Sequence, residues 1–225
     1  MSLDKSPEKI SKMFDNIAKV YDRNNNIISF GTHNIIKKLA VDELDLKDGQ
    51  KVLDICCGTG DIGKILFNTK HKLDVIGVDF SDNMLQICRH NCEEYTDLIK
   101  TDATDLPFEN NEFDIITMTF GLRNIQDRKI AIKEAYRILK PNGQMLHLDF
   151  GRKNLPSKVF DFISKIGIGL FYGNKLPYEY LINSKNEFPE PDLLIKEFEE
   201  ENFKLKKRKD FLFGVISAQI YTKII

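Results

Sequence analysis

Short apolar segments alternate with amphipathic segments through the middle of the chain, and this alternation constrains the fold more than any other feature. The apolar segments that we predict to be strands are residues 51–55, 73–78, 98–101, 113–118 and 144–150. The segments with apolar side chains at helical spacing are residues 61–68, 81–92 and 127–139. Strands separated by helices pair in parallel and are covered on both faces. We therefore predict an α/β fold.

The part of the chain after the fifth strand is predicted to complete the sheet. The elements expected there are an apolar helix at 159–172, an irregular segment at 173–189, a helix at 192–201 and a hairpin of strands 203–213 and 215–224. A hairpin added to five parallel strands places one antiparallel strand in the sheet. The prediction is a mostly parallel seven-stranded sheet with one antiparallel strand and helices on both faces.

The residues before the first strand are predicted to be helical. Ser6 can cap a helix and Pro7 is tolerated at its first position. The polar run 22–26 is expected to end this helix, and residues 32–44 are expected to form a second one. The predicted organisation is a single domain over residues 1–225, with a helical lid at 1–46 and a substrate-side insertion at 151–190.

Charge and cysteine spacing argue against several classes of protein. The 33 basic and 34 acidic residues give a formal net charge of -1, which is not typical of a nucleic-acid-binding surface. No apolar run suits a membrane span or a secretory signal. The four cysteines, which have neither disulfide-framework nor zinc-ligand spacing, are Cys56, Cys57, Cys88 and Cys92. We expect a cytoplasmic protein without a metal, peripheral at most at the inner membrane face, or in the mitochondrial matrix if it is an organellar homologue.

A glycine-containing loop follows the first predicted strand, in the sequence VLDICCGTGD at residues 52–61. Gly58 and Gly60 let the backbone turn sharply and approach a ligand closely. In an open α/β sheet, ligands bind at the carboxyl ends of the strands. A plain tight turn would need the same two glycines, and residues 58–63 also satisfy the G-x-G-x-x-G pattern of dinucleotide-binding proteins. An acidic residue at the end of the second strand, Asp79, fits either ligand class.

The carboxylates around this loop favour a cationic ligand. Asp54 and Asp61 would repel a pyrophosphate, whereas an anion-binding loop gains from an unobstructed helix N-terminus. S-adenosylmethionine carries an ammonium and a sulfonium, which suit these side chains. Asp102 and the backbone of Ala103, after the third strand, are placed to meet an adenine. The charges therefore predict S-adenosylmethionine as the cofactor.

The sequence resembles the C-methyltransferases of ubiquinone and menaquinone biosynthesis over nearly its whole length. The glycine loop and acidic strand ends are common to class I methyltransferases, whereas FGLRN at 120–124 and the tyrosine-rich segment are more specific. The segments that carry the resemblance are FDNIAKVYDRN at 14–24, SFG at 29–31, VLDICCGTGD at 52–61, GVDFSDNML at 77–85, DATDLPF at 102–108, FGLRNIQD at 120–127, RILKPNG at 137–143 and YEYLINSKNEFP at 178–189.

The resemblance implies a Rossmann-like class I fold and S-adenosylmethionine-dependent C-methylation of a polyprenyl quinol precursor of menaquinone, ubiquinone or both. The positions that it implies for the cofactor are Thr59, Asp79, Asp102, Ala103 and Thr119. Three departures fall on the quinone side. They are Asp149-Phe150-Gly151 in place of Glu-Phe-Ser, Gln219 in place of a histidine, and the lack of any tryptophan.

Carbon methylation requires an electron-rich ring, and deprotonation of a quinol hydroxyl supplies one. We predict that Arg123 stabilises the phenolate, that Asn124 orients a water or the ring oxygen, and that Tyr21 closes the site. A structural role is the alternative. Arg123 would then pair with Asp127 or Asp102, and Asn124 would cap the following helix.

Other segments allow two interpretations. The apolar helix 159–172 is either a patch that faces the membrane and the isoprenoid tail or a core helix. The basic run 204–209 favours a solvated edge strand over a surface for anionic lipid or nucleic acid. His147, on a predicted buried strand, is interpreted as a core histidine. Quinone-synthesis proteins and a second copy of the chain are candidate partners.

Two competing functions remain open. One is methyl transfer to another phenolic or lipid-like acceptor. The other is a catalytically silent scaffold in a quinone-synthesis assembly, which the intact acidic loop and the pair Arg123-Asn124 disfavour.

Overall fold

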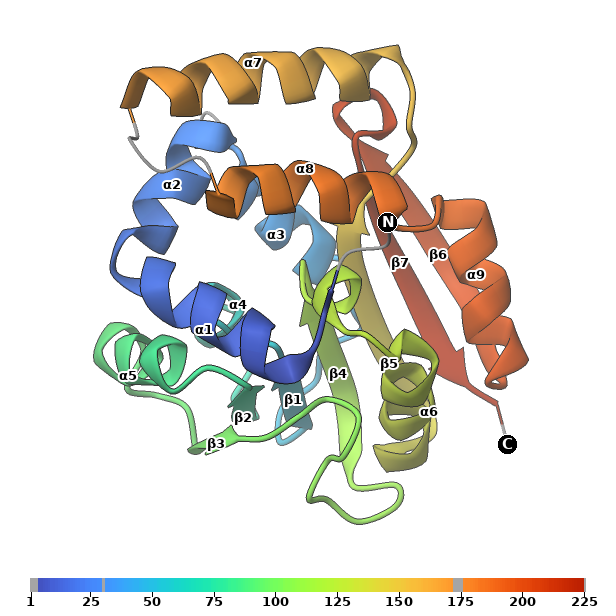
Figure 1. Cartoon of the computed structure of the whole chain (residues 1–225). Coiled ribbons are helices and arrows are strands. Elements are labelled where there is room, and N and C mark those ends of the chain that lie inside the picture. The colour runs from blue at the N-terminus through green and yellow to red at the C-terminus, as the bar shows by residue number, and fades with distance from the viewer. Residues whose placement is uncertain (1–3, 30, 172–175, 225) are drawn as a thin grey trace.

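The computed structural model describes residues 4–29, 31–171 and 176–224, and its centre is a seven-stranded sheet of order β3-β2-β1-β4-β5-β7-β6 (Figure 1). The strands are β1 (Lys51–Ile55), β2 (Asp74–Asp79), β3 (Asp97–Lys100), β4 (Phe113–Thr119), β5 (Leu139–Phe150), β6 (Phe203–Phe211) and β7 (Ile216–Lys223). The first five strands pair in parallel, and β7 is antiparallel to both β5 and β6. The predicted sheet with one antiparallel strand is confirmed.

Helices cover both faces of this sheet because successive strand residues point to opposite sides. Val52 and Ile115 pack in one apolar cluster, while their neighbours Leu53 and Ile116 pack in the other. The helices of the first cluster are α3 (His33–Val41), α4 (Asp61–Phe67) and α5 (Asp82–Asn91). Those of the second are α6 (Arg128–Ile138) and α9 (Pro191–Glu200). The core therefore lies in two layers, one on each side of the sheet.

The remaining helices lie at the edge of the sheet where the parallel strands end. They are α1 (Pro7–Ile17), the 3-10 turn η1 (Ala18–Val20), α2 (Tyr21–Ile28), α7 (Leu155–Phe171) and α8 (Leu176–Glu187). Contacts join α1 to α5 and α2 to α7, so N-terminal and late segments meet over this edge (Figure 1). These helices enclose the cavities described below.

Two predictions about these covering helices are wrong. The polar run 22–26 does not end the first helix but lies inside α2, because the break comes earlier, at η1. Asp22 in this run accepts a hydrogen bond from Thr59, so not every polar side chain of the run faces solvent. Within the segment 173–189, predicted to be irregular, residues 176–187 form α8, which Tyr180 and Lys185 bond to neighbouring elements. The residues at 172–175 lie outside the described part of the chain.

Local stop and start signals have mixed outcomes. Ser81 caps α5, since its hydroxyl accepts from the backbone N–H of Met84 at 3.1 Å, whereas Ser6 makes no side-chain cap. The segment 140–143 contains a proline and a glycine, which commonly end a helix in a turn, but it belongs to β5. Asn142 has a φ of 64° there, and the pairing with β4 shifts between Phe113 and Ile115. The proline and glycine signals thus mark an irregularity within a strand.

Candidate functional site

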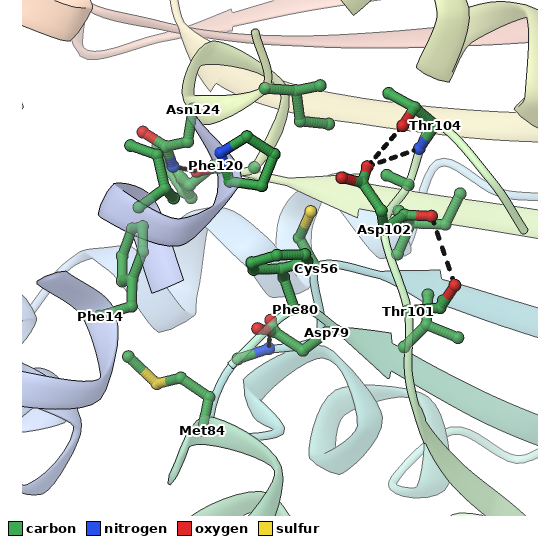
Figure 2. A pocket seen from close by; sticks show the side chains of 18 of the residues that line it. Phe14, Cys56, Asp79, Phe80, Met84, Thr101, Asp102, Thr104, Phe120 and Asn124 are labelled. Carbon is green, nitrogen blue, oxygen red and sulfur yellow. Dashed lines mark hydrogen bonds between the residues drawn. The ribbon is translucent and has the colours of Figure 1, made fainter. Parts of the chain in front are cut away.

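The carboxyl ends of β1, β2 and β4, together with α1, enclose a cavity of about 210 Å³, here called cavity A. Figure 2 shows Phe14 and Met84 on one side of it and Asp102 with Thr104 on the other. The predicted cofactor residues that line it are Gly58, Asp79, Asp102, Ala103 and Thr119. Strand ends meet at a single sheet edge, so residues far apart in sequence are brought together.

Asp79 and Gly58 form the floor of cavity A. The Asp79 carboxylate accepts the backbone N–H of Gly58 at 2.9 Å and that of Ser81 at 2.9 Å, which braces the loop after β1. Burial raises the pKa of Asp79 despite these hydrogen bonds. Gly58 has a φ of 56°, and a Cβ there would project into open space. The glycine thus leaves room in which a ligand can lie against the backbone.

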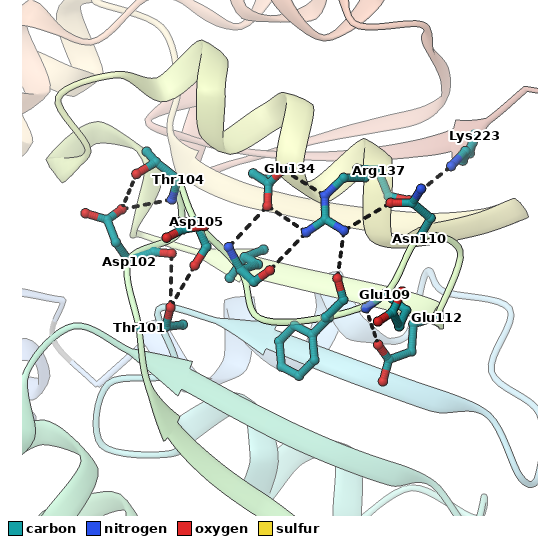
Figure 3. Close-up of polar contacts among 12 residues, drawn as sticks. Thr101, Asp102, Thr104, Asp105, Glu109, Asn110, Glu112, Glu134, Arg137 and Lys223 are labelled. Atoms are coloured by element: carbon teal, nitrogen blue, oxygen red, sulfur yellow. Dashed lines mark hydrogen bonds and ion pairs between the residues drawn. The ribbon is translucent and has the colours of Figure 1, made fainter.

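Asp102 lies on a loop that α6 holds in place. One oxygen of Asp102 accepts from the backbone N–H and the hydroxyl of Thr104, both at 2.8 Å. Arg137 donates to the carbonyls of Phe108 at 2.7 Å and Leu106 at 2.9 Å, further along the same loop (Figure 3). Arg137 therefore holds the later part of the loop that carries Asp102, a role that its sequence did not indicate.

The structure corrects the role expected of Asp54 and Asp61. Asp54 is buried beneath the loop and lines neither of the cavities at this edge, and its carboxylate accepts from Tyr95 and Thr117 at 2.8 Å each. Asp61 pairs with Lys37 at 2.7 Å. The argument from charge was wrong for this pair. The carboxylates that line cavity A are those of Asp79, Asp102 and Asp127.

The other two predicted loop residues, Thr59 and Gly60, do not line cavity A either. Gly60 lines neither cavity, and a Cβ on it would lie 3.0 Å from the sulfur of Cys88, so this glycine permits packing against α5. Thr59 lines the second cavity, and its hydroxyl donates to Asp22 at 2.6 Å. It therefore connects the loop to α2.

Replacing Asp54 by asparagine is expected to change how stability depends on pH. Burial raises the pKa of Asp54 from 3.8 to about 6, so the folded state retains a proton that the unfolded state releases. The free energy of unfolding should therefore lose about 3 kcal/mol between pH 4 and pH 6 through this group. Urea denaturation of both proteins across this range measures the difference in their free energies of unfolding. As pH rises, the variant should become more stable relative to the wild type. A difference that stays constant with pH would contradict the assignment.

A second cavity of about 90 Å³, cavity B, adjoins the first. The residues that line both cavities are Tyr21, Cys56, Gly58, Thr119 and Phe120. Of the predicted catalytic residues, Arg123 lines cavity B, Asn124 lines cavity A and Tyr21 lines both. The structure therefore brings the three to the same edge of the sheet, although no single cavity is lined by all of them.

Arg123 is held in a buried ion pair. Its Nη1 donates to Asp149 at 2.9 Å and to the carbonyl of Phe120 at 2.5 Å, and the two charged side chains are 6% and 0% exposed. The guanidinium lies 5.7 Å from the ring centroid of Phe120 and 5.2 Å from that of Phe150. The alternative pairing with Asp127 or Asp102 is wrong. Asp149 had been noted only as a departure, although its place at the end of β5 could have indicated it.

Asn124 does not cap the next helix. Its amide donates to the carbonyl of Phe120 at 3.2 Å, and its oxygen accepts from the hydroxyl of Tyr180 at 3.1 Å. The first turn of α6 has Asp127 at the cap position, without a side-chain bond. Tyr180 was part of a segment that suggested the resemblance, but no role had been assigned to it. Asn124 thus joins α8 to the turn after β4.

Sequence reasoning also missed His33 and Lys37, which line cavity B from α3. They are four residues apart and therefore share one helix face, which is the signal that could have found them. Both are buried, at 6% and 7% exposure. Two buried, ionisable side chains in the lining of a cavity are candidates for a functional role and are taken up below.

Two other interpretations hold. His147 is buried beside Phe188 and Phe198, and its Nδ1 lies 3.2 Å from the side-chain oxygen of Gln219, as expected of a core histidine. Of the lysines in β6, Lys209 pairs with Glu43 at 2.6 Å, Lys207 pairs with the same carboxylate and Lys206 with Asp45. These pairs support the interpretation as an edge strand.

Sheet order, strand-end cavities and acidic floor together define a class I methyltransferase. The chain belongs to the ubiE/COQ5 methyltransferase family, which matches residues 2–223. It is 38% identical to the demethylmenaquinone methyltransferase of Staphylococcus aureus (strain MRSA252), over 95% of this chain and 92% of that protein. The protein is therefore an S-adenosylmethionine-dependent methyltransferase.

Solved structures share the fold. A SAM-dependent methyltransferase from Aquifex aeolicus aligns over 99% of this chain and all of its own, with a TM-score of 0.64 and 15% identity. The [4+2]-cyclase SpnF aligns over 96% of this chain and 95% of its own, with a TM-score of 0.69 and 14% identity. A cyclase with this fold makes plain that the fold alone does not decide the reaction.

Proposed function

We propose that this enzyme transfers a methyl group from S-adenosylmethionine to a ring carbon of a polyprenyl naphthoquinol, in menaquinone biosynthesis. The name of the Staphylococcus aureus relative supports this acceptor. The observation that carries the proposal is the common wall of the two cavities, with the Arg123 cation buried on the cavity B side. A methyl donor and a ring acceptor need two sites that meet at one wall.

Cavity A suits the methyl donor. Asp79 offers carboxylate oxygens to ribose hydroxyls, and Asp102 and Ala103 offer polar atoms to an adenine. Phe80, Ile55 and Val78 give an apolar surface on which a flat ring can lie. When bound, S-adenosylmethionine supplies an electrophilic methyl group. The open space in front of Gly58 fits a ligand close to the loop.

Cavity B suits the quinol ring. Its apolar wall includes Phe120, Phe150, Phe160 and Leu181. Arg123 stays charged and is a poor base, so we assign to it the stabilisation of the phenolate rather than the removal of its proton. Tyr21 closes the boundary with cavity A. Asn124 positions the turn after β4 through Phe120 and Tyr180, in place of the water-orienting role expected from the sequence.

We propose that residues 1–46 form a lid over cavity A and residues 151–190 an insertion on the substrate side. Phe14 on α1 lines cavity A, and two carboxylates join the N-terminal helices to the body. Asp15 accepts the hydroxyl of Ser81 at 2.5 Å, and Asp22 accepts that of Thr59. Phe160 and Leu181, which line cavity B, lie within the proposed insertion.

A methyl-transfer assay with the purified protein tests the proposal. Labelled S-adenosylmethionine would be incubated with a demethylated polyprenyl naphthoquinol, a 6-methoxy-benzoquinol with the same tail, and a simple phenol, each in reduced form. We expect carbon methylation of the naphthoquinol, identified by mass spectrometry. Preference for the benzoquinol would show that the acceptor is a precursor of ubiquinone rather than of menaquinone. Cofactor binding without transfer to any of the three would favour the scaffold function instead.

We further propose that the tail leaves cavity B toward an anionic membrane surface. Exposed apolar side chains on α7 and on the adjoining turn Leu212–Gly214 form an apolar rim, and one of its members, Leu212, also lines cavity B. Its members are Leu155, Val159, Phe162, Ile163, Leu212 and Phe213. Exposed Arg152, Lys153 and Lys158 lie in the same stretch of chain and suit acidic headgroups. None of the helices in the described ranges could cross a bilayer, so the contact we propose is peripheral.

Replacing Phe162 and Phe213 together by serine is expected to weaken binding to phosphatidylglycerol vesicles at least about tenfold. These two side chains are 66% and 90% exposed, and each would bury apolar area in a bilayer. Vesicle sedimentation measures the change. The matched control is Leu193→Ser on α9, which is also exposed but lies outside the rim. Equal binding by all three proteins would contradict the proposal.

A further inference from the structure

Methylation of a quinol requires an acceptor for the hydroxyl proton, and Arg123 does not supply one. Arg123 is a cation that forms a buried ion pair with Asp149. Among the other groups that line cavity B, Lys37 and Asp61 form an ion pair with each other. The thiol pKa of Cys56 is raised by burial, and that of Cys57 by a hydrogen bond with Cys88 and by burial, so both stay protonated.

His33 differs because its hydrogen bonds fix one tautomer. Ser29 has a single hydroxyl proton and donates it to the carbonyl of Asn25 at 2.6 Å. The Nδ1 of His33 lies 2.9 Å from the same hydroxyl oxygen, so Nδ1 must carry the hydrogen and donate it. The neutral ring therefore has its unprotonated nitrogen at Nε2. Within the described part of the chain, no side chain donates a hydrogen bond to Nε2.

The charges around His33 suit a group that takes up a proton and later releases it. Nε2 lies 3.8 Å from a carboxylate oxygen of Asp61, which stabilises the ring once it is protonated. Asp22 on α2 acts in the same direction, whereas Lys37 on the same helix acts against it. Burial and Lys37 together keep the pKa of His33 below its usual value of 6.5, so the ring is neutral at pH 7. Burial acts to raise the pKa of Asp61, but Lys37, together with the other basic groups nearby, lowers it.

We infer that Nε2 of His33 is the general base that removes the quinol hydroxyl proton, with Asp61 as the residue that stabilises the imidazolium. The quinol O–H bond breaks and an N–H bond forms at Nε2, which leaves a phenolate and a cationic ring without change in total charge. The S–CH3 bond of the sulfonium then breaks as the methyl group bonds to the ring carbon, which leaves a neutral thioether and a neutral ketone form of the ring. The C–H bond at the methylated carbon breaks, and its proton passes through water to the ring oxygen, which restores the aromatic quinol. The proton on Nε2 is released to water. The inference rests on the proposed quinol substrate.

The test compares His33→Gln and His33→Ala with the wild type, in single-turnover methylation of the demethylated naphthoquinol. Both variants should lose roughly 10²-fold or more of the rate, while their affinity for S-adenosylmethionine changes less than threefold. Added imidazole should restore part of the rate of His33→Ala only. The wild-type kcat/KM should fall as pH drops below 6.5 and the ring becomes protonated. The matched control is His71→Gln, a histidine outside both cavities that should keep the wild-type rate.

The outcomes separate this inference from the function on which it rests. If the wild type methylates the quinol and His33→Gln keeps more than a third of the rate, His33 is not the base, although the proposed function stands. A wild-type kcat/KM that stays constant as pH falls below 6.5, down to the pH at which the protein begins to unfold, also overturns the inference, even if both variants prove unstable. A wild type that binds the cofactor but methylates no quinol overturns the function itself.

Discussion

Replacing Arg123 by alanine is expected to abolish most methyl transfer and to lower the free energy of unfolding by about 3–5 kcal/mol. The loss of stability arises because Asp149, whose side chain is fully buried, would lose the cation that pairs with it. The loss of activity, about 10²–10³-fold, arises because cavity B would lack the positive charge that faces the phenolate. Urea denaturation and the methyl-transfer assay measure the two effects, and affinity for S-adenosylmethionine should change little.

A double variant separates the two roles of this ion pair. Arg123→Met with Asp149→Asn removes both charges, and the asparagine oxygen can still accept the backbone N–H of Phe150, as Asp149 does at 2.8 Å. Replacing both members of a buried pair is far less costly than removing one. We therefore expect the double variant to regain most stability and none of the activity. Recovery of the methylation rate in this variant would remove Arg123 from the reaction.

The second large effect is expected from Asp79→Ala, which should weaken S-adenosylmethionine binding at least about 100-fold. Two hydrogen bonds from ribose hydroxyls to a carboxylate would be lost, together worth about 3 kcal/mol or more. The backbone N–H groups of Gly58 and Ser81 would also lose their acceptor, so the loop after β1 would no longer be braced. Isothermal titration calorimetry measures the affinity.

Two controls accompany this variant. Asp79→Asn keeps one acceptor oxygen and should bind with intermediate affinity. Asp74→Ala changes a carboxylate at the other end of the same strand, where it is exposed and accepts from Thr96, and should leave the affinity unchanged. An affinity of Asp79→Ala within threefold of the wild type would mean that cavity A holds the donor in another way.

The strands of the sheet could be predicted closely because their apolar runs are bounded by polar or turn-forming residues. β1 was predicted with the bounds that it has, Lys51–Ile55. The bounds of the covering helices were harder to predict, because they depend on contacts with residues distant in the sequence. The polar residues of α2 indicated a break, yet Asp22 is bonded to a loop 37 residues away. Similarly, Tyr180 and Lys185 on α8 bond to Asn124 and to the carbonyl of Ser157.

The candidate site could be predicted where it depends on strand ends. Gly58, Asp79, Asp102 and Thr119 follow or end parallel strands, so the topology alone brings them to cavity A. Pairings could not be predicted in this way. Several carboxylates follow strands, and only the folded geometry selects one of them for Arg123. Asp61 illustrates the same limit, since Lys37 neutralises it from a helix that precedes the sheet.

The wall that cavities A and B have in common, formed by Tyr21, Cys56, Gly58, Thr119 and Phe120, has a thermodynamic consequence. A ligand in one cavity contacts residues that also line the other cavity. Linkage requires that any factor by which the methyl donor alters the affinity for the quinol equals the factor by which the quinol alters the affinity for the donor. The enzyme therefore responds to the supply of its two substrates through one coupling free energy.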